Sequence, residues 1–270
     1  MAFFTQLKIR SSHCGVNGRL QLARHFEMIN RSVEDWFAGP LDLSFTQMHS
    51  GQQRLGIPTV HIVLDIQALA ALDEVVWTSL QVVELRRSAI ELEVVARCDK
   101  QARFSARVTL IMAHAVQGRL RSMTIPAALR QTMLEDLAAR PEIEKRDVAE
   151  TEYLAFETQE LMSAPRFHEC ERPVYFQDCD PAQIVFYPRY LEMIDDVIDD
   201  WLSSMGIREC RVHAVDVDFQ RPSQLGEALR FTLQLLGAKD ARIYVAVSAA
   251  CEGSSRIGAK LELSFPGAGI

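Results

Sequence analysis

The chain has 270 residues, enough for one large domain or two of ordinary size, and 48% of them are hydrophobic, which excludes a disordered chain. A net charge of −7 gives no general electrostatic basis for binding nucleic acid, whose binders usually carry a basic patch. No apolar run reaches the roughly 18 residues expected of a membrane span.

The first half predicts a strand, a helix and then further strands. The strand covers about 3–10. The start of the chain lacks the long apolar region of a signal peptide. A helix over roughly 22–37 follows a turn, and a loop rich in Gly, Pro, Ser and Gln follows the helix. Strands are then predicted by four runs rich in β-branched residues: VHIVLDI, EVVWTSLQVVEL, AIELEVVARC and RFSARVTLIMA.

The stretch from 125 to 154, IPAALRQTMLEDLAARPEIEKRDVAETEYL, reads as a helix followed by a charged connector. We therefore expect an N-terminal domain over 1–140, a connector over 141–165 and a C-terminal domain over 166–270.

The second half repeats the plan of the first. A strand at about 171–177 leads through the turn QDCDP to a helix over 188–204, where Pro188 suits the first helical turn. Four strand-like runs follow: RVHAVDVDF, ALRFTLQLLG, RIYVAVSAAC and IGAKLELSF. A long helix followed by an antiparallel meander is an α+β layout in which the sheet wraps its apolar face around the helix.

The two halves also align with each other. Residues 9–36 align without a gap on 174–201, with seven identities in 28 positions, and 65–74 matches 218–227 with four identities in ten. Two blocks in the same order indicate an internal duplication.

The six cysteines are scattered and show neither CxxC nor zinc-like spacing, which predicts reduced thiols and no metal site. No Gly-rich phosphate loop and no GxSxG motif appears. The expectation is a soluble cytoplasmic protein without a cofactor.

The segment QDCDPAQIVFYPRYLEMIDDVIDDW resembles the signature GDCDPAGIVxYPxY of 4-hydroxybenzoyl-CoA thioesterase-type hotdog proteins, with Gln177 and Gln183 in place of its two glycines. The whole chain looks like a tandem, double-hotdog acyl-CoA thioesterase. The resemblance implies that the two halves form an internal pseudo-dimer with acyl-CoA along their interface. It also implies an acyl-CoA substrate. The net charge and the lack of a long apolar run, in turn, predict no nucleic-acid and no membrane partner. Proteins of this type often associate further, so a homo-oligomer is one expectation and the oligomeric state stays open.

The resemblance assigns Asp180 as the catalytic carboxylate and the backbone N–H of Tyr187 as the donor that polarises the carbonyl. Thioester hydrolysis needs an activated water or a nucleophile, together with such a donor, so the residues agree. The role of Asp180 as base or nucleophile stays open, as does the alternative that it only caps backbone N–H groups in the turn. Asp178 is expected to stabilise the turn, and Cys179 to pack.

The first half lacks both acids, because His13 aligns with Asp178 and Gly15 with Asp180. One working site per chain is therefore predicted, with His13 as a less favoured substitute base.

Four further residues are candidates for substrate binding. Asp195 lies beside the apolar stripe of its helix, where a boundary acid in a salt bridge is the alternative. Arg86 and Arg87 fall at a hairpin that the resemblance links to CoA. His61, like His213 in the second half, starts a strand and could line the pantetheine channel, or be an ordinary edge histidine.

The predicted function is hydrolysis of an acyl-CoA thioester to a free acid and CoA. The alternatives are a non-catalytic acyl-CoA-binding protein and, less favoured because no His adjoins the DCDP turn, a hotdog dehydratase or hydratase.

Overall fold

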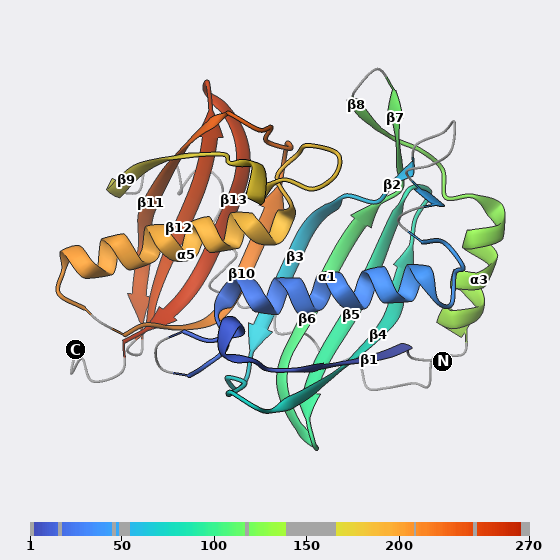
Figure 1. Ribbon diagram of the computed structural model, residues 1–270, viewed down its shortest axis with the longest axis horizontal. Coiled ribbons are helices and arrows are strands. Elements are labelled where there is room, and N and C mark those ends of the chain that lie inside the picture. The colour runs from blue at the N-terminus through green and yellow to red at the C-terminus, as the bar shows by residue number, and fades with distance from the viewer. Residues whose placement is uncertain are drawn as a thin grey trace. The chain divides into compact units, whose positions relative to one another are not determined.

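The computed structural model describes residues 3–15, 18–44, 47–48, 55–116, 119–138, 166–207, 209–239 and 242–265. The chain divides into two compact units, Met1–Ile62 with Gln67–Asp147 and Val63–Ile66 with Val148–Ile270. Each unit combines one long helix with antiparallel strands, which is the predicted α+β layout (Figure 1). The predicted connector, 141–165, lies outside the described residues.

The first half contains a meander of antiparallel strands in the order β1-β4-β5-β6. Its long helix α1 contacts β1 and β4. The main elements are β1 (Phe3–Lys8), the 3-10 turn η1 (Ser11–His13), α1 (Leu22–Ala38), β3 (Thr59–Ile66), β4 (Val75–Leu85), β5 (Ala89–Cys98), β6 (Gln101–Ile111) and α3 (Ala127–Ala138). A small sheet joins β2 (Leu55–Gly56), β7 (Ala113–Val116) and β8 (Arg119–Ser122).

The second half has the strand order β10-β13-β12-β11-β9, again antiparallel throughout. Its long helix α5 contacts β9 and β11. The elements are β9 (Arg166–Pro173), the 3-10 turn η2 (Phe176–Asp178), α5 (Tyr187–Ser204), β10 (Arg211–Phe219), β11 (Ala228–Lys239), β12 (Arg242–Cys251) and β13 (Ser254–Ser264).

The structure bears out the internal duplication. The strand order β1-β4-β5-β6 in the first half has its counterpart in β9-β11-β12-β13 in the second. The two long helices begin at Leu22 and Tyr187, which are 187 − 22 = 165 positions apart, as the alignment requires. The two halves are therefore two copies of one plan.

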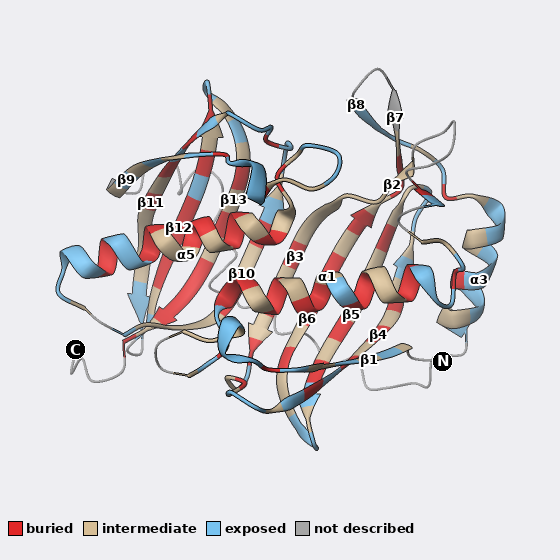
Figure 2. Cartoon of the chain, in the orientation of Figure 1, coloured by how far each residue is buried: buried red, intermediate tan, exposed pale blue. Residues whose placement is uncertain are grey.

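Burial on each long helix follows the predicted stripe. Buried residues recur every three to four positions along α1 and α5, mostly in adjacent pairs, and Figure 2 shows them as red bands separated by tan or blue ones. Both helices place a tryptophan near their C-terminal ends, Trp36 and Trp201, and both side chains are buried. The repeated Trp thus closes the same end of the helix–sheet core in each half.

Strand positions agree closely with the sequence pattern. The β-branched runs form β3 to β6 and β10 to β13, and alternate residues of these strands are buried. The strand predicted at 171–177 is wrong in its bounds, because β9 ends at Pro173, where its pairing with β11 stops, and residues 176–178 form the turn η2. The sheet of β2, β7 and β8 was not predicted, since strands of two to four residues carry too little periodicity.

Candidate active site

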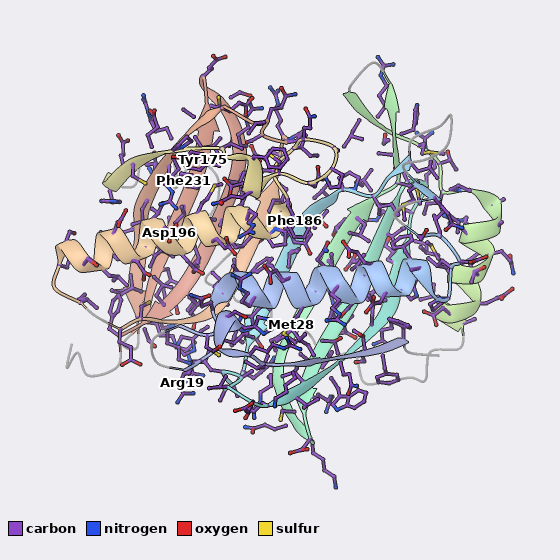
Figure 3. All side chains as sticks on the ribbon, viewed as in Figure 1. Arg19, Met28, Tyr175, Phe186, Asp196 and Phe231 are labelled. Carbon is purple, nitrogen blue, oxygen red and sulfur yellow. The ribbon has the colours of Figure 1, made fainter. Side chains whose placement is uncertain are left out.

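The turn before α5 is held by a set of backbone hydrogen bonds. The Asp178 N–H donates to the Tyr175 carbonyl (3.0 Å), the Asp180 N–H to the Ile184 carbonyl (2.9 Å) and the Phe186 N–H to the Asp178 carbonyl (2.9 Å). Figure 3 labels Tyr175, in the segment between β9 and α5, and Phe186 at the start of α5. Because each bond involves the backbone of Asp178 or Asp180, the turn holds both acids just before the N-terminal end of the helix.

The backbone conformation at position 183 is one that favours the glycine of the signature segment. Gln183 has a φ of 63°, in the left-handed region that glycine adopts most readily. In the first half the aligned residue is Gly18, with a φ of 71°. The turn therefore keeps the same backbone path whether or not it has the glycine.

Asp178 stabilises this turn. Its side chain is buried, and Oδ2 accepts a hydrogen bond from the Tyr175 N–H at 2.9 Å. The carboxylate thus closes η2 in the way a capping residue closes a helix end.

Asp180 is half-buried, and its carboxylate belongs to the turn as well. Its Oδ1 accepts hydrogen bonds from the N–H groups of Ala182 (2.8 Å) and Ile184 (3.4 Å). These two donors orient the carboxyl group, so the capping role that the residue pattern allowed is present. A carboxylate fixed in this way can also meet a substrate in a defined direction.

The helix start supplies the second chemical group. Tyr187 is the first residue of α5, and the N-cap residue Phe186 makes no side-chain cap to the helix. The first-turn N–H groups of a helix have no intrahelical partner and carry the positive end of its dipole. Pro188 contributes no donor. The N-terminus of α5 is thus an electropositive point directly after the two acids.

Cys179, between the acids, is not an activated nucleophile. Burial, with additional contributions from Asp178 and Asp180, raises the pKa of its thiol. The Sγ donates to the Tyr175 carbonyl at 3.6 Å. A thiol held protonated is a poor nucleophile, so the acids remain the chemically competent groups of the turn.

The first half reproduces the turn without its acids. The Gly15 N–H donates to the Arg19 carbonyl (3.0 Å) and the Gln21 N–H to the His13 carbonyl (3.1 Å), in the places of the Asp180 and Phe186 bonds. The Nδ1 of His13 accepts from the Arg10 N–H at 3.1 Å, as Asp178 does from Tyr175. His13 therefore takes over the structural cap, while Gly15 leaves no side chain where Asp180 stands.

The pKa of His13 is also lowered, mainly by burial and next by the charge of Arg24. His61, another sequence candidate, lies half-buried on β3.

Asp195 is not part of the turn. It lies half-buried on α5, eight residues after Tyr187, which is about 12 Å along the helix axis. Burial, and next the charges of Asp199 and Asp195, raise the pKa of the Cys210 thiol to about 12.

Arg86 and Arg87 occupy the predicted hairpin between β4 and β5. Arg86 is exposed and pairs with Glu84 at 2.9 Å, while its carbonyl accepts a hydrogen bond from Arg130 at 2.7 Å. His213 is the third residue of β10 and bonds to Ser264 at 2.8 Å.

Two contacts near the turn, one buried and one partly buried, were not predicted. One joins Tyr190 to Ser223, and the other joins Glu227 to Arg256. Glu227 could have been found, because its identity with Glu74 is one of the four in the second aligned block. Tyr190 and Ser223 differ from their counterparts, so an alignment of the two halves gives no signal for them.

Among the described residues, no group of three or more His, Cys, Asp or Glu side chains could hold a metal ion. In the same part of the chain, no helix is both long and apolar enough to cross a bilayer.

Three solved structures match nearly the whole chain. A protein described as an oleoyl thioesterase from Lactobacillus plantarum is 16% identical, with a TM-score of 0.78, over 98% of this chain and 96% of its own. The 12:0-ACP thioesterase from Umbellularia californica is 13% identical, with a TM-score of 0.78, over 98% and 94%. An acyl-ACP thioesterase from Bacteroides thetaiotaomicron is 13% identical, with a TM-score of 0.73, over 97% and 98%.

No protein-family model matches the sequence, and no curated protein matches it. The structural similarity shows the fold, which is two hotdog domains in tandem, each with a long helix packed on an antiparallel sheet.

Proposed function

We propose that this protein is a thioesterase that hydrolyses an acyl thioester to a carboxylic acid and a thiol, with Asp180 as the catalytic carboxylate. The observation that carries the proposal is the position of Asp180 in the turn that leads into α5, in one of two otherwise matching turns. The folds of three named thioesterases agree with this reaction class.

The chemistry needs two groups, and this turn supplies both. As a base, Asp180 takes a proton from water while the resulting hydroxide adds to the thioester carbonyl carbon. As a nucleophile, its carboxylate adds to that carbon, expels the thiolate and leaves an anhydride that water hydrolyses. In either route the carbonyl oxygen gains negative charge, and the N–H of Tyr187 at the positive end of α5 stabilises it.

The thiol carrier we propose is CoA, on the strength of the DCDP segment and its resemblance to 4-hydroxybenzoyl-CoA thioesterase-type proteins. Two of the full-length structural neighbours are named acyl-ACP thioesterases, which makes an acyl-ACP substrate the second candidate. In this proposal Arg86, Arg87, His61 and Asp195 contact the substrate, and the chain acts in the cytoplasm without a cofactor and assembles as a homo-oligomer.

The test is thiol release from aromatic, short-chain and long-chain acyl-CoAs and from the matching acyl-ACPs. Asp180→Asn should lower kcat by about 10²–10⁴-fold, because the amide keeps the oxygen that accepts from Ala182 and Ile184 but cannot act as a base.

The matched control is Gly15→Asn, in the corresponding turn of the first half, which should leave kcat unchanged. Near-normal turnover by Asp180→Asn contradicts the mechanism. If the protein binds acyl-CoA tightly but hydrolyses no thioester, the proposed thioesterase activity is wrong and the protein is a non-catalytic acyl-CoA-binding protein. Incubation in ¹⁸O-water for a single turnover tests the nucleophile route, since ¹⁸O enters Asp180 only through an anhydride that water opens at the Asp180 carboxyl carbon.

A further inference from the structure

A buried pair of side chains connects the start of α5 to the loop after β10. Tyr190 is 3% exposed and Ser223 is fully buried. The Tyr190 Oη donates to the Ser223 Oγ at 2.8 Å and accepts from the Ser223 N–H at 2.9 Å. Each residue is thus both donor and acceptor to the other, which fixes their relative position.

The same loop also holds the end of the turn that carries the acids. The Ser223 carbonyl accepts a hydrogen bond from the Val185 N–H at 2.9 Å. The rings of Tyr187 and Tyr190 meet Phe219 on β10, with centroids 5.4 and 6.2 Å apart. The turn, the first residues of α5 and the loop after β10 are therefore joined to one another by hydrogen bonds and ring contacts.

The first half is a natural comparison for this pair. The bond from Val185 to Ser223 has its counterpart in the Leu20 N–H, which donates to the Ala70 carbonyl at 2.9 Å. The side-chain hydrogen bond between Tyr190 and Ser223 has no counterpart, because His25 aligns with Tyr190 and Ala70 aligns with Ser223.

His25 instead bonds within its own helix, through Nδ1 to the Gln21 carbonyl at 2.9 Å, and its ring packs edge-on against Phe104. The backbone contact is therefore common to both halves, whereas a hydrogen bond between the two side chains occurs only in the half that contains Asp180.

We propose that Tyr190 and Ser223 are positioning residues for the proposed hydrolysis, an inference that rests on the proposed function. Their bond sets the direction of the first-turn N–H of Tyr187 relative to the carboxylate of Asp180. Rates are sensitive to such placement, since a displacement of about 1 Å can cost roughly 10²-fold. A buried phenol that touches neither substrate nor reacting atoms acts only through this geometry.

The experiment is steady-state kinetics on Tyr190→Phe, Ser223→Ala and the double variant, with the substrate that the wild type hydrolyses best. Tyr190→Phe should lower kcat by about 10–100-fold and leave KM within about twofold, because geometry in the transition state changes while substrate binding does not. The double variant should be no slower than Tyr190→Phe alone, because the two side chains make one interaction.

The matched control is His25→Phe, at the aligned position of α1. Tyr190→Phe and His25→Phe each remove a hydrogen bond of a buried side chain, so the free energy of unfolding should fall in both. The kcat of His25→Phe should stay at the wild-type value, because the lost bond lies within the first half and not at the turn that carries Asp180. This split separates positioning from a general loss of stability.

If the wild type hydrolyses a thioester through Asp180 and Tyr190→Phe keeps the wild-type kcat, the positioning role is wrong and the proposed function stands. An equal fall of kcat in His25→Phe also overturns it. If the wild type releases no thiol from any substrate, the proposed function and the positioning role fail together.

Discussion

Asp178 and Asp180 differ in burial and in the backbone groups they hold. Asp178 is buried and accepts a hydrogen bond from the backbone of the residue before the 3-10 turn. Asp180 is half-buried and accepts one from the backbone of the loop that leads to the helix. In the first half the cap is retained by His13, whose ring nitrogen replaces a carboxylate oxygen, but the second acid is lost. A cap can be exchanged for another acceptor, whereas a catalytic carboxylate cannot.

Removing the cap should therefore affect stability. Asp178→Ala should lower the free energy of unfolding by about 0.5–2 kcal/mol, as the loss of a capping acceptor usually does, because the Tyr175 N–H loses its partner. Asp178→Asn, which keeps an acceptor oxygen, should lose less. Urea unfolding followed by circular dichroism measures both, and a wild-type midpoint for the alanine variant rules out the capping role.

At the scale of elements, a repeated ion pair joins the loop before β4 to β6 in the first half and the loop before β11 to β13 in the second. Arg103 bonds to Glu74 at 2.6 Å, and Arg256 to Glu227 at 2.7 Å, with side chains that are largely buried. Each glutamate also accepts a backbone N–H with its other oxygen, from Ala71 or Gln224, at 3.1 Å. The pair therefore repeats in both halves with the same atoms, which explains why the glutamate is the same in both.

We expect Glu74→Ala and Glu227→Ala each to lower the free energy of unfolding by about 1.5–3 kcal/mol, because a partly buried arginine and a backbone N–H lose a charged partner. The control is Glu84→Ala, which breaks an exposed pair with Arg86 and should produce no measurable change. Equal urea midpoints for Glu227→Ala and Glu84→Ala contradict a structural role for the repeated pair.

At the scale of the whole molecule, the two copies differ in the acids of their turns and in some of their buried polar groups. His25 shows the second kind of change. Burial lowers its pKa to about 4, and in the second half burial, with Arg242 and Arg211, does the same for His213. In the unfolded chain both groups titrate near 6.5.

This difference predicts acid sensitivity between pH 6.5 and about 4. In that range the unfolded chain binds protons that the folded chain excludes, so the free energy of unfolding rises with pH and falls as the solution is acidified. His25 alone contributes a slope of up to about 1.4 kcal/mol per pH unit. Urea unfolding of the wild type and of His25→Phe at pH 7, 6 and 5 isolates it, and parallel pH dependence of the two proteins contradicts the assignment.

Much of the fold follows from local pattern. The runs of β-branched residues mark eight strands of the meanders to within a few residues, and the spacing of Leu191, Ile194 and Ile198 marks the buried face of α5. Both signals persist because each element contacts the core along its whole length. The end of β9 and the three short strands were less predictable, because pairing partners and not periodicity decide where they stop.

The sequence by itself determined that the chain is two copies of one α+β unit and that only the second copy has acids in its turn, since both facts are visible in an alignment of the chain with itself. Only the tertiary structure decided what the acids and their neighbours contact. Asp178 caps the 3-10 turn, Asp180 accepts a hydrogen bond from its own loop, and Tyr190 donates one to Ser223, 33 positions away in the sequence. The physical reason is that hydrogen bonds between distant residues depend on how elements pack, which no local spacing records.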